Sequence, residues 1–221
     1  HVINSYIGFN LLKADIDWGE TLIFVSLFGI GKDIHGFDAG YWVEAGKLKG
    51  VTKFLTDNRV LPDQRSESFG VPRENVIALK YPTPATRKFE NIDSEGRPKV
   101  LWASRLDREK LPSMVFDIAA KMPDVDFHMF GAKVLNDEHL GAPPANVTLH
   151  GAYSGWSSLP NENFSFLLFT SMWEGLPNVT IEALGSGLPI VASNVGAIQE
   201  VVRPDCGILI DDVFNPKPYI K

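Results

Sequence analysis

Two cationic residues in the second half of the chain have the type and spacing needed to bind a phosphorylated ligand. Arg105 and Lys110 stand between an apolar run, residues 99–103, and a helical pattern that opens near Pro112. Cations beside a helix N-terminus stabilise the negative charge that grows on a diphosphate as its bond breaks. Their spacing leaves a second interpretation open, in which both are ordinary solvated charges of a loop.

A pair of glutamates, Glu174 and Glu182, follows a second apolar run, residues 164–169. Gly175 lets the backbone come close to a ligand, and Pro177 suits the first position of a helix, where its missing N–H costs nothing. We therefore expect the two carboxylates to contact the two ends of a ligand with many hydroxyl groups.

The same segment also allows a purely structural interpretation. Ser171 and Glu174 have the spacing of a capping box, and Glu182 could simply face water. Pro177 argues against the box, because it would fall inside the second helical turn. Asn178 lies four residues before Glu182, on the same face of the expected helix. The residues alone leave the binding and structural interpretations even.

Elements that alternate along the chain must position these residues. Short apolar runs bounded by turn residues indicate strands buried on both faces of a parallel sheet, with helices between them. This rhythm predicts an α/β fold with a Rossmann-like doubly wound parallel sheet, in which ligands bind beyond the carboxyl ends of the strands. Strands are expected over residues 21–28, 51–55, 75–79, 99–103, 125–130, 146–149, 164–169, 189–192 and 207–210, and helices over residues 112–121, 178–185 and 197–202.

One break in composition divides the chain. Residues 81–98 contain three prolines among polar and charged residues and predict a linker. Residues 99–221 hold enough strands for a complete Rossmann-like domain. Residues 1–80 hold only about three, so we expect them to be part of a second such domain whose front is missing. Both ends of the chain look cut.

Composition excludes several classes of partner. The 221 residues carry a formal net charge of -6, with 44% hydrophobic and 22% charged residues. This balance is typical of a globular protein and gives no general attraction to nucleic acid or anionic membranes. The single cysteine, Cys206, excludes an intrachain disulfide, and no run reaches the ~20 apolar residues of a membrane span. We expect a cytoplasmic protein.

Four segments in order resemble retaining glycosyltransferases of family 4. Residues 173–193 resemble the donor-binding segment of that family, in which seven residues separate two glutamates. Residues 103–106 with Lys110 are similar to its phosphate loop, and residues 195–200 and 206–210 fit the segments that follow. The resemblance covers residues 100–211 and is fainter before the linker. It implies the two-domain GT-B fold, with residues 99–221 as the domain that binds the nucleotide-sugar donor and residues 1–80 on the acceptor side.

The resemblance implies a hexosyltransferase-type enzyme that moves a sugar from a nucleotide-diphospho-sugar to an acceptor with retention of configuration. Arg105 and Lys110 would bind the diphosphate and stabilise its departure, so neither a metal nor another cofactor is expected. Glu174, the third catalytic residue, would contact hydroxyls of the transferred sugar, and Glu182 the ribose. Further donor contacts are implied at Gly175, Leu176, Pro177 and Asn178, and near the base at Gly151 and Tyr153.

The sequence departs from the family pattern in three places. Leu111 follows Lys110 where the family usually has glycine, which would alter how closely the backbone approaches the phosphates. The glycine-rich loop of the acceptor domain and the C-terminal crossover helix are absent. The acceptor is therefore open among glycans, lipids and small molecules, and missing regions could carry a peripheral membrane attachment. Binding without turnover, and epimerase or phosphorylase activity on the same architecture, remain alternatives.

Two Asp-x-Asp pairs match the metal-binding motif of glycosyltransferases of the other major fold. They are Asp15 with Asp17 and Asp124 with Asp126. Asp124 precedes its expected strand and so stands at the edge of the sheet opposite to the ligand edge. We expect no metal at either pair.

Overall fold

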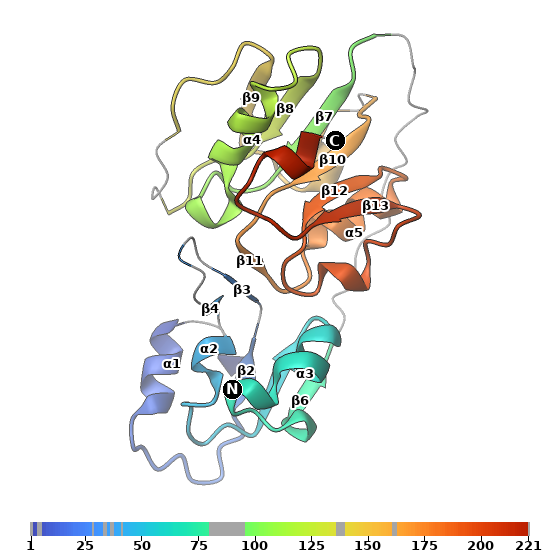
Figure 1. Ribbon diagram of the computed structural model, residues 1–221. Coiled ribbons are helices and arrows are strands. Elements are labelled where there is room, and N and C mark those ends of the chain that lie inside the picture. The colour runs from blue at the N-terminus through green and yellow to red at the C-terminus, as the bar shows by residue number, and fades with distance from the viewer. Residues whose placement is uncertain are drawn as a thin grey trace. The chain divides into compact units, whose positions relative to one another are not determined.

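The computed structural model forms two compact units, shown in Figure 1. The first unit consists of His1–Pro82 with Trp173–Leu176 and Val195–Glu200, and the second of Thr83–Met172, Pro177–Asn194 and Val201–Lys221. The structure describes residues 2–3, 6–27, 29–32, 35, 38–40, 42–79, 96–135, 140–160 and 163–220. The predicted linker lies outside these residues except for 96–98, so its bounds stay a prediction.

A six-stranded, wholly parallel sheet forms the second unit. Its strand order is β13-β12-β10-β7-β8-β9. The strands are β7 (Lys99–Ala103), β8 (Asp126–Phe130), β9 (Val147–Gly151), β10 (Phe166–Phe169), β12 (Ile190–Ser193) and β13 (Gly207–Ile210), with helices α4 (Pro112–Ala119) and α5 (Asn178–Gly185). The chain builds outward from β7 to β9, then returns to β10 and continues the other way. The predicted doubly wound parallel sheet is therefore confirmed.

The central strands of this sheet could be predicted from continuous apolar runs because both of their faces are covered. Trp102 in β7, Phe127 in β8 and Leu167 in β10 are all fully or almost fully buried. Alternating polar and apolar residues would indicate a sheet with one solvated face; β7 and β10 lack this alternation, whereas β8 shows it over Asp126–Met129. The predicted bounds agree at β7, β13 and α5, and differ by one or two residues at β8, β9, β10, β12 and α4.

The helix expected over residues 197–202 is wrong. Only a 3-10 turn forms there, Ile198–Glu200. Gly196 precedes it with a φ of 59°, and Pro204 follows it. A stretch of seven residues between a left-handed glycine and a proline is too short to nucleate an α-helix, whereas a three-residue 3-10 turn forms readily.

The first unit contains a four-stranded parallel sheet in the order β1-β2-β5-β6. Its strands are β1 (Val2–Ile3), β2 (Phe24–Ser26), β5 (Lys53–Thr56) and β6 (Val76–Ala78), and its helices α1 (Tyr6–Lys13), α2 (Trp42–Ala45) and α3 (Val60–Arg65). Strands β2, β5 and β6 were predicted, and each is shorter than its predicted range. The other elements were not predicted; β1 and α2, with two and four residues, are too short to show a period.

A second, antiparallel sheet of this unit joins segments far apart in the sequence. Its order is β11-β3-β4, with β3 at Ile30–Lys32, β4 at Asp38–Gly40 and β11 at Trp173–Glu174. The unit's apolar core, which includes Phe9, Leu12 and Trp42, also contains the fully buried Ala197. Residues near the end of the chain are thus built into the first unit.

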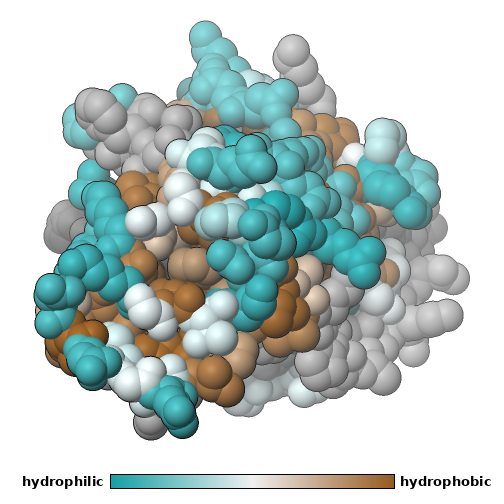
Figure 2. Space-filling view, turned by 90° about the horizontal axis from the view of Figure 1, so that it is seen from below, coloured by the Kyte–Doolittle hydropathy of each residue, from teal (hydrophilic) through white to brown (hydrophobic). Residues whose placement is uncertain are grey.

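Apolar side chains on the surface are interspersed with polar ones. Leu11, Ile16 and Leu22 of the first unit are exposed, and Figure 2 shows apolar surface broken up by hydrophilic residues on the face viewed from below. Such mixing is ordinary for a protein surface. No helix of the described chain combines the length and apolar character that crossing a membrane requires.

Candidate functional site

The strand order of the second unit reverses between β7 and β10. The chain leaves these adjacent strands in opposite directions, which opens a crevice beyond their carboxyl ends where α/β proteins bind ligands. The loop after β7, residues 104–111, carries Arg105 and Lys110 and leads directly into α4 at Pro112. Their predicted placement, between a strand and a helix N-terminus, is confirmed.

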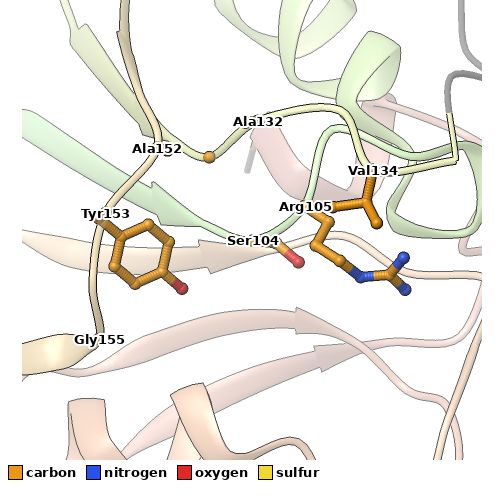
Figure 3. Close-up of a pocket in the computed structure, with 8 residues that line it drawn as sticks. Ser104, Arg105, Ala132, Val134, Ala152, Tyr153 and Gly155 are labelled. Atoms are coloured by element: carbon orange, nitrogen blue, oxygen red, sulfur yellow. The ribbon is translucent and has the colours of Figure 1, made fainter.

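A cavity of about 350 Å³ lies at this edge of the sheet. Figure 3 shows the side chains of Tyr153, Ser104 and Arg105 among its walls. Its lining comes from the loops after β7, β8 and β9: Ser104, Arg105, Gly131, Ala132, Val134, Ala152, Tyr153 and Gly155. Two of the predicted site residues, Arg105 and Tyr153, are therefore brought to one cavity although 48 positions separate them.

Arg105 is held by two buried carboxylates. Its guanidinium forms ion pairs with Asp107 and Glu109, whose side chains are 0% and 9% exposed, while Arg105 itself is 41% exposed. The Asp107 Oδ1 also accepts hydrogen bonds from the backbone N–H groups of Val134 and Leu135, at 2.9 and 2.8 Å. Arg105 is therefore a fixed cation at the cavity and not a freely solvated loop charge.

Asp107 joins the loop after β7 to the loop after β8. Burial acts to raise the pKa of its carboxyl, but the N–H donors of Leu135 and Val134 and the charge of Arg105 outweigh burial. The pKa of Asp107 consequently lies below its ordinary value. Asp107 is thus ionised at neutral pH and supplies both a partner for Arg105 and an anchor for the neighbouring loop.

Gly131 lines the cavity and was not selected from the sequence. Its φ is 155°, and a Cβ at this position would overlap the carbonyl oxygen of Ser104. Its N–H donates to the carbonyl of Gly151 at 2.7 Å. The signal that could have found it is its position as a glycine directly after an apolar strand, at the ligand edge of the sheet.

Lys110 is fixed through its backbone and is not among the residues that line the cavity. It ends the 3-10 turn Arg108–Lys110, and its carbonyl accepts a hydrogen bond from Thr170 Oγ1 at 2.8 Å. That hydroxyl also accepts from the Nε1–H of the buried Trp102 at 2.9 Å. Lys110 is thereby tied to the end of β10, the other strand at which the chain direction reverses.

Leu111, where the family pattern has glycine, adopts a conformation that suits glycine. Its φ and ψ are 49° and 50°, the one positive φ outside glycine in the part of the chain that the structure describes. The left-handed region costs an ordinary residue about 1–2 kcal/mol. The Leu111 side chain is 9% exposed, so its packing offsets this strain.

Leu111→Gly is expected to be more stable than Leu111→Ala by about 1 kcal/mol, although both are less stable than the original chain. Both variants lose the buried side chain, but only glycine relieves the backbone. Urea denaturation measures the difference. Ser113, an exposed residue of α4, is the matched control, because glycine there should be less stable than alanine by about 1 kcal/mol. The same order at both positions would contradict the assigned strain.

Glu182 is half-buried in α5, as the predicted helix places it. Burial raises the pKa of its carboxyl. The pKa of Tyr153 is raised by burial first and then by the charge of Glu182, so the two groups interact electrostatically. The structure thus relates Glu182 to a residue that lines the cavity, whereas Asn178 is exposed at the first position of the helix.

Two details of the sequence-based interpretation of this helix are wrong. Pro177 is the N-cap and not the first helical residue, because its ψ of 122° is extended and the helix begins at Asn178. A capping box from Ser171 does not form. Ser171 is fully buried and its hydroxyl donates to the carbonyl of Glu109 at 3.0 Å, on the loop after β7.

The loop after β9 borders a second cavity. Gly151 ends β9 with a φ of 80°, and the residues that follow it face both cavities. The second cavity, of about 650 Å³, shares Ala152 and Tyr153 with the first; its lining is Phe130, His150, Ala152, Tyr153, Ser154, Ser158 and Pro160. The His150 ring stacks on Phe130 with centroids 4.2 Å apart. The loop predicted to lie near the base therefore has room for a flat ring beside it.

The remaining predicted residues, Glu174, Gly175 and Leu176, belong to the first unit. Glu174 in β11 pairs with Ile30 of β3. The carbonyl of Gly175 accepts the N–H of Ala197 at 2.9 Å. The predicted site residues are thus distributed over both units, with Arg105, Lys110, Gly151, Tyr153, Pro177, Asn178 and Glu182 in the second.

The described residues contain no group of three or more His, Cys, Asp or Glu side chains placed to hold a metal ion. Asp15 and Asp17 are exposed, and Asp124 precedes β8 as expected.

The reversed strand order, the cationic loop beyond β7 and the cavity at its edge define a Rossmann-like doubly wound domain with a ligand site at the carboxyl ends of its strands. Residues 97–217 match the family described as Glycosyl transferases group 1, which is more than half of the chain. The protein belongs to this family.

The sequence identity to individual curated relatives is low. The chain is 29% identical over 168 residues to spore coat protein SA of Bacillus subtilis, covering 63% of this chain and 43% of the relative. It is 22% identical over 199 residues to the O-antigen biosynthesis glycosyltransferase WbnH of Escherichia coli, covering 84% of this chain and 57% of the relative. The chain therefore spans about half the length of the curated relatives it matches.

Solved structures share the fold. The structure of TarM superposes with a TM-score of 0.66 at 18% identity, covering 99% of this chain and 46% of TarM. Anabaena HepE in complex with UDP-glucose gives 0.62 at 16% identity, covering 86% of this chain and 58% of HepE. At these identities the likeness shows the GT-B fold.

Proposed function

We propose that the protein transfers a sugar from a nucleotide-diphospho-sugar to an acceptor, with retention of configuration. The observation that carries this proposal is the cavity beyond the carboxyl ends of β7, β8 and β9, with Arg105 and Tyr153 on its walls. Membership of the Glycosyl transferases group 1 family supports sugar transfer. The complex of HepE with UDP-glucose supports the class of donor.

In this proposal the diphosphate binds at the loop after β7. Arg105 and Lys110 neutralise the charge that develops as the glycosidic bond breaks, which is the role a metal ion has in other transferases. A diphosphate carries more charge than either Asp107 or Glu109, so it can share Arg105 with them. The N-terminal end of the α4 dipole adds to the attraction, because a helix N-terminus favours anions.

The nucleoside lies along the loop after β9 and the start of α5. The ionised carboxylate of Glu182 accepts hydrogen bonds from ribose hydroxyls, and the base lies near Gly151 and Tyr153. Glu174, with the backbone amides of Gly175 and Leu176, contacts the hydroxyls of the transferred sugar. Pro177 and Asn178 complete this stretch at the start of the helix.

Glu182→Gln is expected to weaken UDP-glucose binding by about tenfold to a hundredfold at pH 7, because charged hydrogen bonds contribute ~1.5–3 kcal/mol. Since the pKa of Glu182 is raised, affinity of the original chain should fall as the pH drops through that pKa, and the variant should lack this dependence. Isothermal calorimetry with UDP-, GDP- and ADP-sugars measures both effects. Glu20→Gln, at an exposed position of the first unit, is the control.

Equal affinity of the Glu182→Gln variant and the original chain for the donor that binds best would contradict the assigned role. Release of nucleoside diphosphate only when an acceptor is present separates sugar transfer from the alternatives. An epimerase needs no acceptor, a phosphorylase needs inorganic phosphate, and a chain that binds without turnover releases nothing.

A further inference from the structure

Three buried polar residues follow one another at the carboxyl end of β5 in the first unit. Thr56, Asp57 and Asn58 are 3%, 8% and 0% exposed. Buried polar groups are kept in a fold when they are hydrogen-bonded, and each such group specifies the geometry of its partners. The hydrogen-bond partners of these three residues therefore show which part of the fold the three residues position.

Asn58 fixes the carboxylate of Asp57. Its Nδ2 donates to Asp57 Oδ1 at 2.8 Å and to Thr56 Oγ1 at 3.1 Å. Its Oδ1 accepts the N–H of Leu61, in the first turn of α3, at 2.9 Å. With Oδ1 of Asp57 occupied in this way, Oδ2 is the oxygen that accepts the N–H of Leu176, at 3.1 Å.

The peptide that Asp57 contacts is held closely on its other sides. Strand β11 pairs with β3, and a Cβ added to Gly29 would lie 2.7 Å from the carbonyl carbon of Glu174. A Cβ at Gly196 would overlap the carbonyl oxygen of Glu174. The peptide Glu174–Leu176 thus packs directly against the backbone on these sides, and Asp57 fixes its last N–H.

A carboxylate is a costly choice for this position, because burial penalises its charge. Burial raises the pKa of Asp57 above its ordinary value; the donors from Asn58 and Leu176 oppose this, and the charge of Glu174 adds to it. A neutral acceptor would satisfy the Leu176 N–H at a smaller cost. A charged acceptor binds the N–H more strongly and holds the peptide more rigidly.

We propose that Asp57 is a positioning residue for sugar recognition, whose carboxylate fixes the Leu176 amide and thereby the backbone that presents Glu174 and Gly175 to the transferred sugar. The inference rests on the proposed function, in which these residues contact the sugar hydroxyls. It adds Asp57, which lies outside the segments that resemble the family's donor-binding motifs, to the residues that position Glu174 and Gly175.

Asp57→Asn tests this role. Both carboxylate oxygens of Asp57 accept from N–H donors, so the amide must place its own NH2 against either Asn58 or Leu176. Calorimetry should show that UDP-glucose affinity falls about tenfold while UDP affinity changes less than twofold, since UDP lacks the sugar. Asp63→Asn removes an exposed carboxylate of α3 that bonds Arg73, and both affinities should stay unchanged. Asp57→Ser replaces the variant if Asp57→Asn does not fold.

Equal losses for UDP and UDP-glucose would show a general structural role and overturn the proposal, as would no loss for either. Hydrogen exchange of the Leu176 amide provides a readout that needs no ligand. Exchange should be slow in the original chain and in Asp63→Asn, and at least tenfold faster in Asp57→Asn; equal rates overturn the proposal. A chain that binds neither UDP nor UDP-glucose overturns the proposed function instead, and exchange still decides whether Asp57 holds the peptide.

Discussion

Replacing Gly131 by alanine is expected to destabilise the second unit by about 4 kcal/mol and to abolish donor binding. The added Cβ would overlap the carbonyl oxygen of Ser104. This oxygen is a backbone atom, so no side-chain rotation can relieve the overlap. The positive φ of 155° adds strain for any residue with a Cβ. The β8 and β7 loops must therefore move apart.

Hydrogen bonds on both sides of Gly131 make this movement costly. Its N–H bonds the Gly151 carbonyl at 2.7 Å, and the N–H of Ser104 bonds the Phe130 carbonyl at 3.0 Å. The N–H of Leu106 bonds the carbonyl of Ala132, also at 3.0 Å. Each bond lost costs about 1 kcal/mol. Because Ser104 and Gly131 both line the cavity, the displacement also changes its shape.

Gly141→Ala is the matched control. A Cβ there meets nothing within 4 Å, and the backbone is not in the left-handed region. Its free energy of unfolding should stay within about 0.5 kcal/mol of the original chain. Urea denaturation followed by tryptophan fluorescence compares the two variants. If Gly131→Ala proved as stable as Gly141→Ala, the close approach of the β7 and β8 loops would be disproved.

The parallel sheet of the second unit could be predicted from the sequence because its central strands β7, β10 and β12 bury residues on both faces. Lys99–Ala103 and Gly207–Ile210 read as continuous apolar runs, and α5 lies between a proline and glycines that delimit it. These signals are local. The rule that ligands bind at the carboxyl ends of the strands then selected Arg105 and the start of α5 without any knowledge of the strand order.

The interactions that hold the site were beyond sequence reasoning because they are not local. Asp57 and Leu176 are 119 positions apart, and the pairing of β11 with β3 joins strands of two and three residues. No periodicity marks such short strands. Arg105 was predicted as a cation for phosphate, but its spacing to Asp107 and Glu109 did not reveal that both acids would be buried against it.

Asp107→Ala is expected to lower the free energy of unfolding by about 3–5 kcal/mol, because it removes a buried ion-pair partner and leaves two backbone donors unsatisfied. Asp107→Asn separates these effects. Val134 and Leu135 both donate to Oδ1, while Arg105 bonds Oδ2. The asparagine oxygen can keep both backbone bonds, so this variant should lose only the Arg105 interaction and about 1–3 kcal/mol.

Asp117, exposed on α4, supplies the control, and Asp117→Asn should stay within about 0.5 kcal/mol of the original chain. Equal stability of Asp107→Ala and Asp107→Asn would show that the two backbone bonds contribute nothing. The Asn variant also tests the cavity. Because Asp107→Asn removes the charge of one of the two partners of Arg105, the affinity of this variant for UDP should differ from that of the original chain. The UDP affinity of Asp117→Asn should not change.

The dependence on pH identifies the charge as the cause. Because the folded-state pKa of Asp107 lies below its unfolded value of about 3.9, its contribution to stability is fully present above that pH. As the pH falls, the unfolded chain takes up a proton first, and the contribution is lost as the pH passes through the folded-state pKa. The stability difference between the original chain and Asp107→Asn should therefore be constant from pH 5 to 8 and shrink below about 4. A difference that persists unchanged at low pH would assign it to packing and not to the Arg105 ion pair.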